Sequence, residues 1–220
     1  MLNFEEREER KKQIGASEIY KLLNFDSEMA QDLFELKIGL QDYVELDNDA
    51  IIAGNILEEQ CLEFYAKSRN VQIAMNERIE HPRIKGLVAS LDGRELITSI
   101  PIENKVINEK VWLSWIAKRV FNAKYEDIKL NVPKRYYCQT QTQMAVCNVE
   151  QAVINVNTLT DEEQLDPINV TITEIHNKQI IIERDDDLIS ELEKRASYML
   201  DCIKYKHRPS ENDYLEKNLF

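Results

Sequence analysis

The spacing of apolar residues changes from a helical to a strand-like period near residue 70, and this change constrains the fold more than any other feature of the sequence. Before it, a short helix is expected from Ser17 to Leu23, with Ser17 as its N-cap. A second helix is expected after Ser27, another residue suited to cap a helix, and a third from about Asn48 to Ser68. The first third of the chain is therefore predicted to be helical.

Beyond residue 70 the pattern predicts strands separated by helices. The expected strands are Val71–Met75, Ile84–Leu91, Leu96–Thr98, Pro101–Ile107, Ala152–Thr158, Val170–Ile175 and Gln179–Glu183. Asp92-Gly93 is a turn signal between two of them. The expected helices are Glu109–Val120, Lys134–Cys147 after Pro133, and Asp185–Tyr205. This order predicts an α/β fold with a central mixed β-sheet flanked by helices, and the absence of repeats and linkers predicts one domain over residues 1–220.

Composition disfavours several classes of protein. No apolar run approaches the roughly 20 residues that a membrane helix needs, and the charged start MLNFEEREERKK is unlike a signal peptide. We therefore expect a cytoplasmic protein with no membrane partner. The four cysteines form no CxxC pair, and the five glycines form no phosphate-binding loop. The net charge of −12 disfavours a protein that coats nucleic acid, but not a nuclease whose carboxylates bind a divalent metal.

One group of residues in the predicted sheet suits metal-dependent hydrolysis. Side chains alternate along a strand, so Glu103 and Lys105 point to the same side, which Asp92 at the end of the preceding strand is placed to reach. Two carboxylates and a backbone carbonyl suit Mg²⁺, and a lysine beside them can orient water or stabilise developing charge. The alternative is a charged strand edge with no catalytic role.

Flanking segments favour the catalytic interpretation. Glu58, in a predicted helix, offers a third carboxylate. Gln139 and Gln143 share a helix face at a spacing of four residues, and their amides can bind phosphate or water without competing for a metal.

A second polar group lies near the start of the chain. Arg10 precedes Gly15-Ala16-Ser17-Glu18, and a hydroxyl and exposed amides near an arginine suit a phosphate pocket. The alternative for Ser17 is an ordinary helix N-cap.

The order of these motifs resembles the phage lambda exonuclease family, which includes the YqaJ-like viral recombinases and belongs to the PD-(D/E)xK nuclease superfamily. The motifs are RxxxxxxSE from Arg10, GxxxE ending at Glu58, Ser90-Leu91-Asp92, ExK from Glu103, QxQxxM from Gln139 and IERDDDL at Ile182–Leu188. Together they extend from about Arg10 to Tyr198. Ser-Leu-Asp stands where the family more usually has Ser-Pro-Asp. The resemblance implies a restriction-endonuclease-like core.

The resemblance also implies a metal site. Asp92 and Glu103 would bind Mg²⁺, which Mn²⁺ can replace, with help from the Asn104 carbonyl. Lys105 would be the catalytic lysine, and Glu58 would complete the site, at a second metal.

For the substrate, the resemblance implies that Gln139 lies beside the active centre, with Gln141 the next match along the helix. Arg10 and Ser17 would bind the 5′-phosphate of a DNA end. Members of the family digest one strand of linear duplex DNA from 5′ to 3′ and leave a 3′ overhang. Their partner is a single-strand annealing protein, the lambda enzyme is a trimeric ring, and the expected setting is the cytoplasm of a bacterial host cell.

Two other functions stay open at this point. An endonuclease or nickase of the same fold would cut DNA internally. A catalytically silent acidic protein would bind a basic partner, although such a protein has no need of a lysine between carboxylates.

Overall fold

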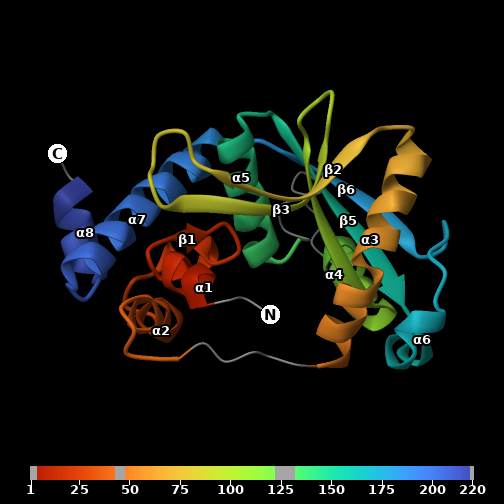
Figure 1. The fold of residues 1–220 in the computed structure, drawn as a ribbon, viewed down its shortest axis with the longest axis horizontal. Helices are drawn as coiled ribbons and strands as arrows, with labels where there is room; N and C mark the ends of the chain where they lie inside the picture. The colour runs from red at the N-terminus through yellow and green to blue at the C-terminus, as the bar shows by residue number, and fades with distance from the viewer. Residues whose placement is uncertain (1–3, 43–47, 122–131, 219–220) are drawn as a thin grey trace.

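The computed structural model describes residues 4–42, 48–121 and 132–218, and its strands form one mixed sheet (Figure 1). The strands are β1 (Ile14–Gly15), β2 (Ile73–Glu80), β3 (Leu87–Glu95), β4 (Pro101–Asn108), β5 (Gln151–Leu159) and β6 (Asn177–Glu183). Their order is β1-β3-β4-β5-β6, with β2 paired to β3 as well. The β1–β3 and β4–β5 pairs are parallel, and the other pairs are antiparallel. The predicted mixed α/β fold is confirmed.

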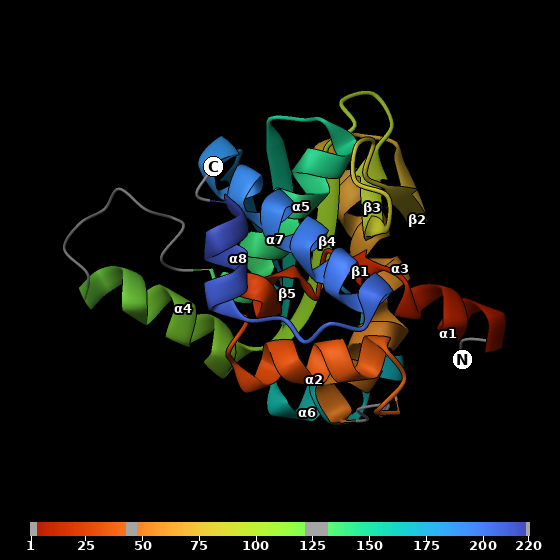
Figure 2. The same cartoon turned by 90° about the vertical axis from the view of Figure 1, so that its left-hand side faces the viewer.

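Helices cover both faces of this sheet. The α-helices are α1 (Phe4–Lys11), α2 (Glu28–Lys37), α3 (Asp49–Arg69), α4 (Glu109–Phe121), α5 (Lys134–Cys147), α6 (Asp161–Leu165), α7 (Asp186–Tyr205) and α8 (Glu211–Asn218), and the 3₁₀ helices are η1 (Ile19–Leu23) and η3 (Pro167–Asn169). α3 packs Leu62 and Tyr65 against Val153 of β5, whereas α5 packs Met144 against Ile154. Because successive strand residues face opposite sides, α3 and α5 lie on opposite faces. α7 lies over α5 (Figure 2).

The residues at the starts of the helices agree only in part with the predicted N-caps. The Ser27 hydroxyl accepts a hydrogen bond from the Ala30 amide at 3.3 Å, which confirms its predicted role as N-cap of α2. Asn48 caps α3. Ser17 caps no helix, because the predicted helix from Ser17 to Leu23 is a 3₁₀ helix that begins only at Ile19 and has no side-chain cap. The ordinary N-cap interpretation of Ser17 is therefore wrong.

The predicted turn at Asp92-Gly93 is also wrong, because both residues lie inside β3. The chain reverses after β3, through a turn that contains Ser99 with a φ of +60°, and the predicted strand Leu96–Thr98 belongs to this turn. Gly93 is small for a packing reason, since a Cβ there would lie 3.1 Å from Leu62 Cδ2. The glycine lets α3 approach the sheet.

The predicted strand Val170–Ile175 does not form, and this segment runs from η3 to the turn before β6. The backbone of this segment forms hydrogen bonds with a side chain where a strand would have a neighbouring strand as its partner. Gln60 of α3 donates to the Val170 carbonyl at 3.3 Å and accepts from the Ile172 amide. The helices α1, α6 and α8 were not expected from the sequence. Within the described ranges, no helix is long and apolar enough to cross a membrane.

Candidate active site

β3 and β4 separate where the predicted acidic residues lie. The two strands pair only at Gly93 with Ile102 and at Arg94 with Pro101. Beyond these pairs, the Asp92 carboxylate replaces a strand carbonyl as an acceptor, because its Oδ2 receives a 2.7 Å hydrogen bond from the Asn104 amide. Asp92 is thereby held against β4.

Glu103 and Lys105 share one side of β4, as their alternation predicts. Lys105 Nζ forms an ion pair with Glu103 Oε1 and donates to the Asn104 carbonyl at 2.9 Å. Glu103 is 1% exposed, and 22% of the Lys105 side chain is exposed. Three oxygen ligands for a metal are predicted on these strands. The Lys105 ammonium contacts two of them, the Glu103 carboxylate and the Asn104 carbonyl.

Gln143 of α5 holds Glu103 through its second oxygen. Gln143 Nε2 donates a 2.6 Å hydrogen bond to Glu103 Oε2, and the whole Gln143 side chain is buried. Its Oε1 atom has no hydrogen-bond partner among the described residues. The family resemblance singled out Gln139, whereas the sequence pattern itself treated Gln139 and Gln143 alike. The shared helix face of these two glutamines was the signal that could have identified the second.

The other two glutamines of α5 have different surroundings. Gln141 Nε2 donates to the Glu183 carbonyl at 2.8 Å, and its Oε1 accepts from the Asp185 amide at 2.9 Å, so this side chain joins α5 to the connection between β6 and α7. Gln139 is partly buried, and its side chain makes no hydrogen bond within the described part of the chain. Within the described part of the chain, neither side chain therefore forms a hydrogen bond with Glu103, whose Oε2 accepts from Gln143 instead.

The charges of the site shift one another's pKa. Burial raises the pKa of Asp92 to about 7, with a further contribution from the Glu103 carboxylate, while Lys105 acts in the opposite direction. Burial opposes the charge of Lys105, but Glu103 and Asp92 outweigh it and raise the pKa of the lysine. The pKa of Glu58 on α3 is also raised, mainly by burial. The charge of Lys105 opposes this shift and that of Glu103 adds to it. Glu58 is therefore near enough to interact with the site's charges.

The donor set fits a hard divalent cation. Mg²⁺ prefers oxygen ligands and keeps several waters. Asp92, Glu103 and the Asn104 carbonyl supply such oxygens, and the ammonium of Lys105 already lies against two of them. The buried Oε1 of Gln143 is an acceptor that a water of hydrated Mg²⁺ would satisfy. No three His, Cys, Asp or Glu side chains in the described ranges form a ready-made metal cluster, so the fit depends on two carboxylates and a carbonyl.

A buried asparagine network supports the site from the opposite face of the sheet. Asn104 Oδ1 accepts from Asn155 Nδ2 at 2.9 Å and from Asn157 Nδ2 at 3.0 Å. Asn177 Nδ2 in turn donates to Asn155 Oδ1 at 2.7 Å and to Asn157 Oδ1 at 2.9 Å. A satisfied polar network in a buried place holds one geometry. It fixes Asn104, and with it the backbone between Glu103 and Lys105.

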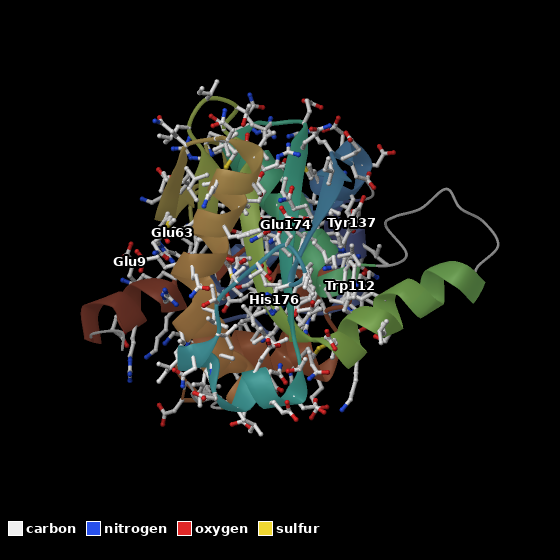
Figure 3. All side chains as sticks on the ribbon, turned by 90° about the vertical axis from the view of Figure 1, so that its right-hand side faces the viewer. Glu9, Glu63, Trp112, Tyr137, Glu174 and His176 are labelled. Atoms are coloured by element: carbon white, nitrogen blue, oxygen red, sulfur yellow. The ribbon has the colours of Figure 1, made fainter. Side chains whose placement is uncertain are left out.

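Aromatic residues border the lysine on the side of α4. The Lys105 ammonium lies 5.4 Å from the centre of the Tyr136 ring, and Trp115 lies 5.9 Å from Tyr136. Trp112, at the base of α4, continues the row, 6.0 Å from Trp115 (Figure 3). α4 extends away from the sheet beyond this point (Figure 3).

The predicted phosphate-binding residues lie on the first two elements of the chain. Arg10 is exposed in the last turn of α1, and Ser17 is exposed in the turn that follows β1. β1 pairs with β3 at Leu87 and Val88, so this turn lies along the strand that carries Asp92. Within the described ranges, neither the Arg10 guanidinium nor the Ser17 hydroxyl makes a hydrogen bond with the protein.

Similar structures are exonucleases. An alkaline exonuclease from Laribacter hongkongensis is 25% identical over 96% of this chain and 94% of its own, with a TM-score of 0.65. The same enzyme in complex with dAMP gives a TM-score of 0.67 at 25% identity, over 99% of this chain and 98% of that one. A phage-related exonuclease from Haemophilus somnus shares the fold at 20% identity, with a TM-score of 0.60 over 88% of this chain and 96% of its own.

No curated protein sequence matches the chain. A sequence model of the YqaJ-like viral recombinase domain matches residues 7–150. The matched range includes α3, β3, β4 and α5, and therefore all of the carboxylates, the lysine and the glutamine described above. With its exonuclease-like fold, this match supports a nuclease role. The chain belongs to the YqaJ-like viral recombinase family.

Proposed function

We propose that the protein is a Mg²⁺-dependent exodeoxyribonuclease that digests one strand of linear duplex DNA from 5′ to 3′ and leaves a 3′ overhang. The observation that carries this proposal is the contact of the Lys105 ammonium with the Glu103 carboxylate and the Asn104 carbonyl, beside Asp92. The family and the similarity to the alkaline exonuclease of Laribacter support it.

Each residue then has a physical task. Mg²⁺, or Mn²⁺ in its place, supplies the positive charge that polarises the phosphodiester and favours ionisation of the attacking water. Asp92, Glu103 and the Asn104 carbonyl would hold it, with Glu58 to one side. Lys105 is placed to donate to the phosphate oxygen on which charge develops, because its ammonium lies at the same oxygens. Arg10 and Ser17 offer donors to the 5′-phosphate of the DNA end.

Two further proposals concern the partner and the assembly: the family description as a viral recombinase supports the first, and the second rests on the resemblance to the lambda exonuclease family. The 3′ overhang is passed to a single-strand annealing protein, and the nuclease acts as a trimeric ring around its DNA. Size-exclusion chromatography with light scattering tests the ring, and co-purification with a single-strand annealing protein tests the partner.

The activity is tested with linear duplex DNA labelled at the 5′ or the 3′ end, in the presence of Mg²⁺. We expect the 5′ label to leave first and Lys105→Ala to remove the activity while the protein stays folded. Closed circular DNA should stay intact. Cutting of the circle would favour the endonuclease instead, and intact linear DNA with a folded wild-type protein would exclude both nucleases.

A further inference from the structure

Lys37 is a buried lysine outside the carboxylate site. It is the last residue of α2 and is only 8% exposed. Its Nζ lies 2.8 Å from Glu18 Oε2 and donates to the Arg10 carbonyl at 3.0 Å. Burial of an ammonium is unfavourable unless the group is paired and hydrogen-bonded, and both conditions hold here. The two contacts reach the two segments that carry Arg10 and Ser17, and α1, β1 and α2 lie together at this end of the molecule (Figures 1 and 2).

The contact with Arg10 fixes the end of α1. The last carbonyls of a helix have no partner inside the helix and carry partial negative charge. The Arg10 carbonyl accepts from the Gln13 amide at 3.3 Å and from the Lys37 ammonium, whose positive charge complements the helix end. Arg10 is an exposed residue, and Lys37 binds the backbone from which its guanidinium extends.

The contact with Glu18 fixes the turn around Ser17. The amides of Ile14 and Ala16 each bond to the neighbouring chain segment at 2.8 Å, which leaves the Gly15 amide pointing the other way. Glu18 Oε2 accepts that amide at 2.8 Å, and the same oxygen binds Lys37. The carboxylate and the Ser17 hydroxyl both border Gly15, since a Cβ on Gly15 would meet Glu18 Oε2 at 3.5 Å and Ser17 Oγ at 3.7 Å.

We propose that Lys37 is a positioning residue for recognition of the 5′-phosphate, an inference that rests on the proposed function. Lys37 neutralises the Glu18 carboxylate, which would otherwise repel a phosphate at Ser17, and it holds the Gly15–Glu18 turn beside Arg10. It does not touch the DNA itself. The recognition of an anion beside Glu18 therefore depends on a buried cation beneath the binding surface.

The test compares linear duplexes that end in a 5′-phosphate or a 5′-hydroxyl. For Lys37→Met, we expect KM on phosphorylated ends to rise by at least about tenfold, with kcat and the activity on hydroxyl ends unchanged. The double variant Lys37→Met/Glu18→Gln no longer has the uncompensated carboxylate, and the glutamine oxygen can still accept a hydrogen bond from the Gly15 amide. Most of the preference for 5′-phosphorylated ends over 5′-hydroxyl ends should therefore return. A purely structural lysine would give no such recovery.

The matched control is Lys178→Met, which removes the same charge from β6 at the opposite edge of the sheet and should leave both substrates unaffected. Thermal unfolding of each variant confirms that it is folded. If Lys37→Met does not fold, Lys37→Gln, which keeps a donor for the Arg10 carbonyl, carries the same expectation.

The outcomes separate the inference from the proposed function. Folded Lys37→Met with an unchanged phosphate preference, or with equal losses on both ends, overturns the role of Lys37 alone. If the double variant does not regain the preference for phosphorylated ends, the proposal that Lys37 acts by neutralising Glu18 is wrong. A wild-type protein with no preference for phosphate contradicts the 5′-phosphate site itself, and the inference fails with it.

Discussion

Gln143 donates a 2.6 Å hydrogen bond to Glu103, so α5 on one face of the sheet fixes the carboxylate at the centre of the site. The other oxygen of Glu103 binds Lys105. Both carboxylate oxygens therefore have protein partners, and the position of Glu103 is set by residues from two elements. Groups that orient a ligand in this way commonly affect a metal site nearly as much as the ligand itself.

We expect Gln143→Met to reduce Mg²⁺-dependent nuclease activity by about ten- to a hundredfold, because Glu103 loses the donor that orients it. Methionine has a similar length, so the buried space stays filled. Gln139→Met, on the same helix one turn earlier, should have the smaller effect, since within the described ranges no hydrogen bond joins the Gln139 side chain to the acidic residues of the site. Steady-state rates on linear duplex compare the two. A larger loss in Gln139→Met would restore the role that the family resemblance gave to that residue.

The sequence identified the centre of the candidate site because alternation along a single strand is a local property. Glu103 and Lys105 share a face whatever their surroundings are, and the structure has them in contact. Asp92 was expected near them at a turn. It reaches them from within a strand instead, because β3 continues past the point where its pairing with β4 ends.

Contacts between distant segments could not be read in this way. Gln143 and Gln139 present the same pattern, and only the packing of α5 against β4 decides which one meets Glu103. Asn155 and Asn157 look like polar interruptions of an apolar strand until their shared partner, Asn104, is seen across the β4–β5 pair. The polar residues were visible, but the partners that explain them were not.

Removal of Lys105 should separate metal binding from catalysis. The ammonium lies at two of the proposed Mg²⁺ ligands, so Lys105→Met frees those oxygens and leaves the carboxylates without a compensating charge. We expect Mg²⁺ to bind about tenfold more tightly to this variant while nuclease activity is lost. Isothermal titration measures the affinity, with Lys178→Met as a control for net charge. Weaker binding in Lys105→Met would show that these oxygens are not the ligands.

A charged cluster between α7 and α8 should make stability depend on pH. Arg195 binds Glu211 with an Nη2–Oε1 distance of 2.7 Å, and this bond, with the Phe25 amide, lowers the pKa of Glu211 from its ordinary 4.5 although burial opposes the shift. A carboxyl whose pKa is lower in the folded state stabilises the fold above its unfolded pKa and loses that contribution as pH falls. We expect Glu211→Gln to cost about 1–2 kcal/mol at pH 7, because the ion pair is only partly buried.

The difference between wild type and Glu211→Gln should shrink as the pH falls below 4.5, where the carboxyl of the unfolded chain takes up a proton, and should be lost once the pH has passed the lower pKa of the folded state. Urea unfolding at a series of pH values measures it. A difference that is constant with pH would mean that the glutamine disturbs packing rather than charge.

Two glycines offer a paired test of the approach between α3 and the sheet. Neither Gly93 nor Gly54 has a positive φ, so alanine is compatible with both backbones. At Gly93 a Cβ would lie 3.1 Å from Leu62 and 3.4 Å from Ile102, whereas at Gly54 nothing lies within 4 Å. Gly93→Ala should therefore lower the free energy of unfolding by about 1–3 kcal/mol, and Gly54→Ala should raise it by up to about 1 kcal/mol through helix propensity. Because Gly93 adjoins Asp92, the first variant should also lose nuclease activity. Equal stability of the two variants in urea would mean that β3 does not need a residue without a side chain where α3 packs against it.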